Sequence, residues 1–240
     1  MDPDFWHQRW QARQIGFHQS APHPFLERCW PSLNVATGAR VYVPLCGKSL
    51  DMVWLSVRGY RVVGSELSSL AVEEFFGEQQ RTDVQIERHG SFHWHRSGAF
   101  EIFAGDALQL TPELLGPVQA AYDRAALVAL PPSMRERYAQ HFATLMPAGS
   151  RTLLVAFEYE QAIRDGPPFS VDPDEVQRLY RDFFRVEELE RVAARRDEQA
   201  PQCGPLGDRL SVGLGRRLKL LLDEHARLGE HAVRWTARRG

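Results

Sequence analysis

Residues 41–49 read VYVPLCGKS, an apolar run that ends in a glycine turn, and residues 61–66 read RVVGSE, a second apolar run that ends in a carboxylate. Both runs have the length and composition of buried strands. Stretches with helical spacing follow them, over residues 50–58 and 69–80. This order of strand, helix, strand and helix predicts an α/β fold, in which a parallel sheet is covered by helices on both faces.

The same alternation extends to both sides of this stretch. Helices are expected near the start of the chain, over residues 4–13 and 24–34. Further along the chain we expect a strand pair at residues 84–104 with a turn at Gly90 or Gly98, single strands at 120–123 and 151–159, and helices at 132–146 and 172–184.

Three strand ends carry groups that suit a ligand. Leu45 and Gly47 follow the first strand, Glu66 ends the second, and Asp106 and Ala107 follow a later one. Ligands of open parallel sheets bind at such carboxyl ends. Gly47 would let the backbone approach a ligand, the Glu66 carboxylate could accept hydrogen bonds from both ribose hydroxyls, and Asp106 with Ala107 could address an adenine edge. These positions predict an adenosine pocket; the alternative is that Glu66 only caps the following helix.

Phosphate-binding loops are missing from the sequence. It contains neither G-x-G-x-x-G nor G-x-x-x-x-G-K-[ST], the loops that bind the phosphates of dinucleotides and nucleoside triphosphates. The predicted pocket therefore favours a nucleoside cofactor without phosphates over NAD or ATP.

Composition narrows the class of protein. The chain has 240 residues, 43% hydrophobic and 25% charged, and its 29 basic residues nearly balance 31 acidic ones, which argues against a dedicated nucleic-acid binder.

Cys29, Cys46 and Cys203 are odd in number and widely spaced, so we expect neither disulfides nor a metal site. No signal peptide is visible, and no apolar run approaches the roughly 20 residues of a membrane helix. We expect a soluble cytoplasmic protein without a nucleic-acid or membrane partner.

Five blocks of sequence resemble the thiopurine S-methyltransferases. Residues 41–52 (VYVPLCGKSLDM) are similar to the cofactor loop of that family, and residues 59–68 (GYRVVGSELS) match the stretch that follows it. Phe75-Phe76 follows that second block at the expected distance. The remaining three matches, in the same order as in the family, are Trp10 with residues 15–18 (IGFH), residues 122–130 (YDRAALVAL) and residues 166–169 (GPPF). The likeness runs from about residue 5 to about residue 190.

The resemblance implies a class I methyltransferase fold, a Rossmann-like three-layer sandwich. Its mostly parallel sheet would have seven strands, the last two forming a hairpin. A single domain would fill residues 1–240, with an N-terminal helical lid over 1–35, a cofactor-binding core over 36–190 and a divergent segment over 191–240. We expect a monomer.

The resemblance also implies the cofactor and its site. S-adenosylmethionine, which becomes S-adenosylhomocysteine, would be held by Trp10, Leu45, Glu66, Asp106, Ala107 and Arg124, with Gly47 in the cofactor loop. Phe17 matches an aromatic residue beside the acceptor pocket. Aromatic faces such as Trp10 and Phe17 could stabilise the positive sulfonium. Asp123, at the end of a central strand, is either a proton acceptor or an organiser of the pocket.

The implied reaction is methylation of sulfur in thiopurines or related aromatic thiols, and bacterial relatives are also associated with selenium and tellurium compounds. In-line transfer from an activated donor needs alignment and exclusion of water rather than an elaborate catalytic set. Two alternatives stay open. One is a methyltransferase for another small acceptor, such as a halide or another thiol. The other is a cofactor-binding protein whose turnover is impaired by its divergent tail.

Several polar residues have simpler interpretations. His93 and His95 would share a strand face, where exposed histidines are expected rather than a metal site. Cys46 is expected to be a small buried residue because no base partners it. Asp51 is expected to serve the N-terminus of the helix that starts near it.

The C-terminal part departs from the family pattern. Residues 191–227 are rich in arginine and show no good strand. This stretch resembles unrelated sequence inserted before the end of the chain, and a disturbed reading frame in the gene is one hypothesis for its origin. Residues 228–239 could still supply the last strand, and residues 208–228 have the leucine spacing of an amphipathic surface helix.

Overall fold

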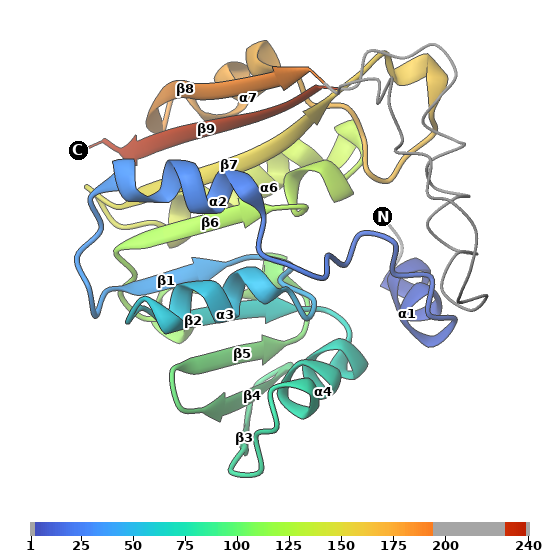
Figure 1. Cartoon of the computed structure of the whole chain (residues 1–240), viewed down its shortest axis with the longest axis vertical. Helices are drawn as coiled ribbons and strands as arrows, with labels where there is room; N and C mark the ends of the chain where they lie inside the picture. The colour runs from blue at the N-terminus through green and yellow to red at the C-terminus, as the bar shows by residue number, and fades with distance from the viewer. Residues whose placement is uncertain (1–2, 194–228, 239–240) are drawn as a thin grey trace, which may run out of the picture.

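The sheet of this protein has nine strands in the order β3-β4-β5-β2-β1-β6-β7-β9-β8 (Figure 1). The structure, a computed structural model, describes residues 3–193 and 229–238. From β5 to β7 neighbouring strands are parallel, whereas the pairs that involve β3, β4, β8 or β9 are antiparallel. The α/β class and the mostly parallel sheet expected from the sequence are confirmed.

The elements have the following bounds. The strands are β1 Arg40–Val43, β2 Arg61–Glu66, β3 Gln85–His89, β4 Phe92–Ser97, β5 Phe100–Ala104, β6 Ala120–Arg124, β7 Arg151–Glu158, β8 Phe184–Ala193 and β9 Gly229–Ala237. The helices are α1 Pro3–Gln11, α2 Pro24–Cys29, α3 Leu50–Val57, α4 Ser69–Glu78, α5 Pro112–Leu115, α6 Pro132–Leu145 and α7 Pro173–Tyr180, with short 3-10 turns between several of them.

Two more strands are present than the seven expected. The stretch over residues 84–104 forms three strands rather than a pair, because the chain turns at both Gly90 and Gly98, where φ is +60° and +58°. β5 joins the parallel part of the sheet beside β2, and the β3–β4 hairpin extends the sheet beyond it. The prediction of a single turn was therefore wrong, and the class of fold is unaffected.

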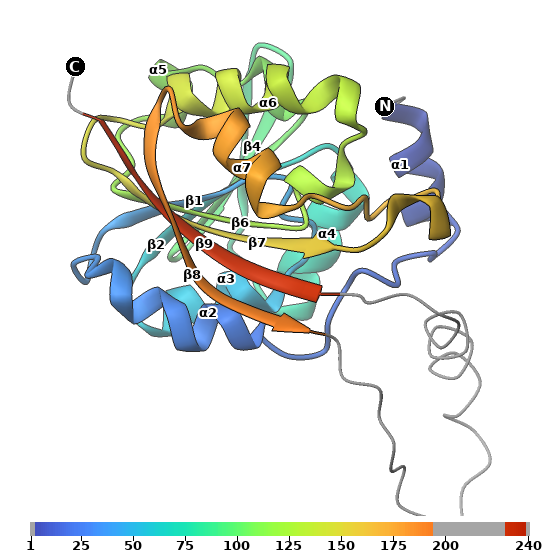
Figure 2. The same ribbon diagram turned by 90° about the horizontal axis from the view of Figure 1, so that it is seen from above.

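Helices cover both faces of the sheet. Figure 2 shows α5, α6 and α7 on one side and α2 and α3 on the other. The first side buries Tyr42, Tyr138 and Phe142 together. The second side buries residues of α2, α3 and α4 such as Leu26, Met52 and Phe75. The predicted three-layer sandwich is confirmed.

The last strand comes from the segment that departs from the family pattern. β9 pairs with both β7 and β8, which confirms that the end of the chain supplies a strand. Its Trp235 is buried and stacks on Tyr180, with ring centroids 4.3 Å apart. Residues 194–228 lie outside the described residues, and with them the predicted helix over 208–228, Cys203 and most of the Arg-rich stretch.

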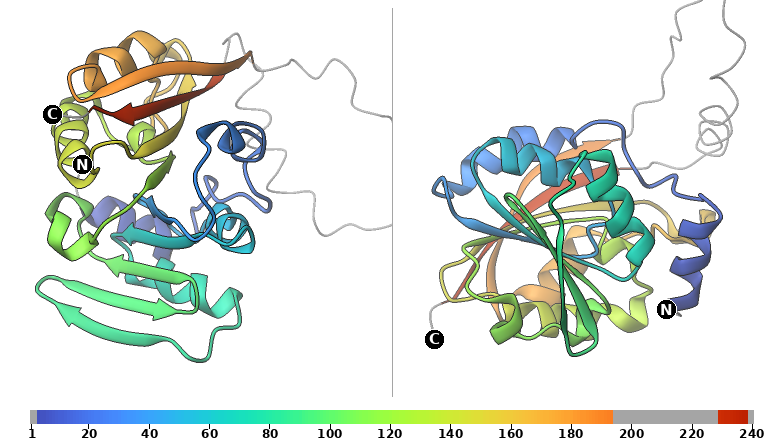
Figure 3. Two further views of the ribbon diagram at one scale, coloured as in Figure 1. Left: turned by 90° about the vertical axis from the view of Figure 1, so that its left-hand side faces the viewer. Right: turned by 90° about the horizontal axis from the view of Figure 1, so that it is seen from below.

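α1 lies beyond the carboxyl ends of the central strands, at one end of the sheet (Figures 1 and 3). That edge carries the predicted ligand-binding positions, so α1 lies on the same side of the sheet as they do. Among the described residues no helix has the length and apolar character needed to cross a bilayer.

Candidate active site

Glu66 joins the ends of the first two parallel strands. Its buried carboxylate accepts hydrogen bonds from the Gly47 amide and the Ser68 amide, both at 2.8 Å. Burial raises the pKa of this carboxyl, and the backbone hydrogen bonds oppose that effect. Ser68, rather than Glu66, caps α4, because its hydroxyl accepts from the Ala71 amide. An ionised carboxylate offers about four acceptor positions, and the Leu67 amide also acts on this carboxyl, so acceptor capacity remains for a ribose hydroxyl.

The loop after β1 brings its backbone close to this carboxylate. Leu45 and Gly47 both adopt left-handed backbone conformations, with φ of +46° and +51°. A Cβ placed on Gly47 would lie 3.2 Å from the Trp10 ring, closer than ordinary van der Waals contact, so glycine suits the close approach of α1. Trp10, Leu45 and Gly47, expected together from the sequence, lie together here.

α1 and the segment that follows it carry an aromatic cluster. Trp10 is buried, and its ring meets that of Phe17 edge-on with centroids 5.6 Å apart. The Trp6 ring also meets that of Phe17 edge-on, with centroids 5.7 Å apart. Phe17 therefore contacts two indoles, and these aromatic rings gather near the cofactor-side ends of the strands.

Asp106 and Ala107 follow β5 at the same edge of the sheet. The Gly105 amide donates to the Glu66 carbonyl at 2.8 Å, which places this loop beside Glu66. The Asp106 carboxylate accepts from the Leu108 amide at 2.9 Å and caps a short 3-10 turn. His141 of α6 donates from Nε2 to the Ala107 carbonyl at 2.9 Å, and burial lowers the pKa of this imidazole. Sequence reasoning missed His141, because nothing local connects α6 to this loop.

Asp123 and Arg124 end β6 and point to opposite faces of the sheet, as neighbouring strand residues do. Asp123 is fully buried and accepts from the Tyr138 hydroxyl at 2.7 Å and the Leu127 amide at 3.3 Å. Burial raises the pKa of the Asp123 carboxyl to about 6. Its two oxygens are therefore engaged with α6 and the loop after β6.

Arg124 turns toward α3 and the lid. Its Nε donates to the Asp51 carboxylate at 3.0 Å, and its Nη1 donates to the Phe17 carbonyl at 3.4 Å. The guanidinium thus lies beside Phe17, which the resemblance assigned to the acceptor pocket. Asp51 lies in the first turn of α3, but Ser49 supplies the cap of that helix, and the Asp51 carboxylate instead accepts from Arg124 and the His23 amide. The predicted place of Asp51 at the N-terminus of this helix is confirmed, and its hydrogen bonds with Arg124 and His23 are an addition that the sequence did not predict.

Lys48 fastens the cofactor loop to α4. Its almost fully buried ammonium contacts Glu74 at 2.8 Å and Glu78 at 2.6 Å, and Arg13 also reaches Glu74 at 3.3 Å. The loop after β1 is therefore held by Glu66 on one side and by an ion-pair cluster on the other.

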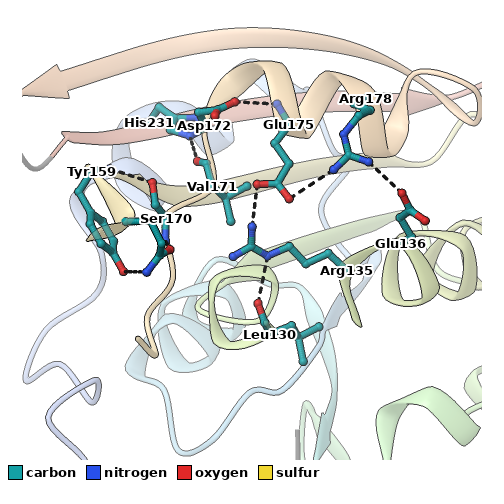
Figure 4. A network of polar contacts seen from close by, with 11 residues as sticks. Leu130, Arg135, Glu136, Tyr159, Ser170, Val171, Asp172, Glu175, Arg178 and His231 are labelled. Carbon is teal, nitrogen blue, oxygen red and sulfur yellow. Dashed lines mark hydrogen bonds and ion pairs between the residues drawn. The ribbon is translucent and has the colours of Figure 1, made fainter. Parts of the chain in front are cut away.

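The loop between β7 and α7, which contains residues 166–169, is braced by a second polar network (Figure 4). Arg135 of α6 is buried and links the Leu130 carbonyl to Glu175 at 3.0 and 2.6 Å. Within the loop, the Tyr159 amide donates to Ser170 at 2.9 Å, and the Phe169 amide donates to the Val128 carbonyl at 2.7 Å. These contacts hold the loop against the segment that follows Arg124.

The remaining polar candidates are structural. His95 is buried and stacks on Phe76, so the expectation of two exposed histidines holds only for His93. Cys46 is buried, and burial raises the pKa of its thiol well above the ordinary value, as expected of an unreactive packing residue. No group of three or more histidine, cysteine or acidic side chains within residues 3–193 and 229–238 could hold a metal ion.

Solved structures with the same fold define the class. A methyltransferase dependent on S-adenosylmethionine from Anabaena variabilis aligns with a TM-score of 0.61 at 14% identity, over 98% of this chain and 95% of that one. The 1,6-didemethyltoxoflavin N1-methyltransferase of Burkholderia thailandensis, solved with S-adenosylhomocysteine, aligns with a TM-score of 0.60 at 15% identity, over 98% of this chain and 86% of that one. The fold is that of the class I methyltransferases that use S-adenosylmethionine.

Sequence comparison supplies the family. The family model described as thiopurine S-methyltransferase (TPMT) matches residues 1–205. A thiopurine S-methyltransferase of Pseudomonas fluorescens is 52% identical over 190 residues, 79% of this chain and 87% of that protein. One of Methylococcus capsulatus is 48% identical over 189 residues, 79% of this chain and 85% of that protein. The chain belongs to the thiopurine S-methyltransferase family and is an enzyme that uses S-adenosylmethionine for S-methylation.

Proposed function

We propose that this enzyme methylates the sulfur of a small aromatic thiol of the thiopurine type, with the strand-end cluster around Glu66 as its cofactor site. S-adenosylmethionine, when bound, supplies an activated methyl group. The observation that supports the site best is the buried Glu66 carboxylate, which fixes two loops through backbone amides and keeps acceptor capacity for a ribose hydroxyl.

The other cofactor residues follow from their place around that carboxylate. Trp10 would cover the cofactor from the lid, Leu45 and Gly47 would contact it through their backbone, and Asp106 with Ala107 would face the adenine. Apart from Trp10, which lies in α1, these residues follow the carboxyl ends of β1 and β5, beside Glu66 at the end of β2, where ligands of such sheets bind. Arg124, at the end of β6, would contact the cofactor from the side of α3.

Phe17 and Arg124 are proposed to line the side of the site where the acceptor binds. Arg124 donates to the Phe17 carbonyl, so the lid segment and the end of β6 meet there. A guanidinium beside this segment would favour the thiolate form of an aromatic thiol, which ionises easily, and no strong base is then required. Asp123 is proposed to be a pocket organiser rather than the proton acceptor, because Tyr138 and Leu127 occupy both of its oxygens.

Mass spectrometry of the purified protein with S-adenosylmethionine and 6-mercaptopurine tests this proposal. A product one methyl heavier is expected from the natural sequence, and little or none from Arg124→Ala. A panel of a halide, a selenium species and an aliphatic thiol, run in parallel, measures acceptor class. Product from one of these and none from the thiopurine would replace the aromatic thiol by that acceptor.

We further propose that the enzyme works as a monomer in the cytoplasm. The strand ends and the lid that make up the site come from one chain, and Cys29 and Cys46 are free thiols. Light scattering after size-exclusion chromatography measures the mass in solution, and a mass of two or more chains would contradict the monomer.

A further inference from the structure

Asp51 lies where three parts of the fold meet. Its carboxylate is almost completely buried, with 1% of the residue exposed. One oxygen accepts from the Arg124 Nε at 3.0 Å and the other from the His23 amide at 2.7 Å. The first turn of α3, the end of β6 and the segment that leads from the lid to α2 are therefore joined by one side chain.

The contact with Arg124 fixes the direction of the guanidinium. Arg124 is a rigid planar group with five N–H donors, and the Asp51 and Phe17 contacts use two of them. Its side chain is 9% exposed, so it has little room for another orientation. Tyr122, two residues earlier on the same face of β6, is buried beside the pair, where burial and then the Asp51 carboxylate raise the pKa of its hydroxyl.

We propose that Asp51 is the positioning residue of the site: it holds the Arg124 guanidinium so that its remaining donors face the bound cofactor. Through the His23 amide the same carboxylate ties that orientation to the segment behind the lid. The inference rests on the proposed role of Arg124 in the cofactor site, and it assigns to Asp51 no contact with either reactant.

A double-mutant cycle scored on the affinity for S-adenosylhomocysteine, measured by calorimetry, tests this inference. Asp51→Asn keeps the shape of the side chain but removes the charge that anchors Nε. We expect affinity to fall about tenfold or more, since hydrogen bonds to charged groups are the strong ones. The affinity of Arg124→Ala should fall at least as far. The double variant should bind S-adenosylhomocysteine no more weakly than Arg124→Ala alone. Losses that multiply, or an unchanged affinity in Asp51→Asn, would overturn the inference.

Two further variants separate positioning from general stability. Asp51→Glu keeps the charge and should bind S-adenosylhomocysteine more tightly than Asp51→Asn, whereas a space-filling role predicts the opposite order. If Asp51→Asn does not fold, the cycle is run with Asp51→Glu, and non-additivity is again expected. Asp172→Asn is the matched control: Asp172 accepts from the Glu175 amide at 2.7 Å as the cap of α7, and the affinity of this variant should stay within about twofold.

The outcome for the natural sequence keeps the two proposals apart. If the natural sequence binds S-adenosylhomocysteine but methylates no acceptor, the proposed function is contradicted. The role of Asp51 can then still be tested, because the double-mutant cycle measures affinity and not turnover. No binding at all would overturn both. Normal binding and turnover with an additive cycle would overturn only the role of Asp51.

Discussion

The Gly47 amide donates a hydrogen bond of 2.8 Å to the Glu66 carboxylate, so one side chain fixes the geometry of the cofactor loop and is also proposed to bind the ribose. The second oxygen of Glu66 accepts from Ser68 at the start of the next loop. A change at Glu66 should therefore affect the ligand and both loops together.

Replacing Glu66 with Gln should weaken S-adenosylhomocysteine binding by about tenfold to hundredfold. The amide keeps one acceptor oxygen, but its NH₂ group would face an N–H donor, and hydrogen bonds to a charged group are worth about 1.5–3 kcal/mol. Isothermal calorimetry measures the affinity. Glu113→Gln, an exposed acid in the first turn of α5, is the control and should bind normally. Unchanged affinity in Glu66→Gln would count against the ribose role.

Replacing Gly47 with Ala should both destabilise the fold and weaken cofactor binding. The left-handed backbone alone costs about 1 kcal/mol with a Cβ present, and the new methyl group would lie 3.2 Å from the Trp10 ring. Gly90→Ala is a matched control, since φ there is +60° and a Cβ would meet nothing within 4 Å. Urea unfolding should show a similar loss of stability for both, and only Gly47→Ala should lose affinity for S-adenosylhomocysteine. Equal affinities in the two variants would mean that the contact between Trp10 and Gly47 is unimportant.

The strand ends were predictable because they depend on local patterns. Apolar runs mark β1 and β2, and the polar residue at the end of each run marks the edge of the sheet. β8 was missed because it is a mostly exposed edge strand, whose sequence FRVEELERVA is rich in charge. The helix expected before it ends at Tyr180 instead of residue 184, since the chain leaves α7 to begin this strand.

The partners of the site residues were not predictable in the same way. Asp51 accepts from groups 28 and 73 residues away, and no local pattern pairs such distant positions. Alternation along β6 requires Asp123 and Arg124 to face opposite sides, but only the packing of α6 and α3 shows which side each one faces.

The stability of the protein should fall as pH rises through the range in which Asp123 ionises. Burial raises the pKa of Asp123 from 3.8 to about 6, so the folded state holds this proton more tightly than the unfolded chain. The stabilisation is complete below pH 3.8 and is lost as pH approaches 6. The difference between the two pKa values corresponds to about 3 kcal/mol.

The Asn side chain of Asp123→Asn cannot ionise, so this variant should not lose stability as pH rises through this range. Its amide oxygen can still accept a hydrogen bond from Tyr138. The free energy of unfolding of the variant, relative to the natural sequence, should therefore rise by about 2–3 kcal/mol between pH 4 and pH 7. Urea unfolding at several pH values measures it. Parallel curves for the two proteins would contradict the raised pKa, and loss of turnover with normal S-adenosylhomocysteine binding would restore Asp123 as a proton acceptor.

Replacing Trp235 with Ala should destabilise the fold strongly, because β9 supplies the strand between β7 and β8. Trp235 is buried, stacks on Tyr180 and contacts the Phe142 ring edge-on at 6.1 Å. Large-to-small changes of a core tryptophan cost about 3–5 kcal/mol, which urea unfolding can measure. Val57→Ala is the control, since Val57 is apolar but 77% exposed, and it should change stability by no more than about 0.5 kcal/mol. If both variants unfold alike, the end of the chain does not pack against α6 and α7, and the enzyme must fold without its last strand.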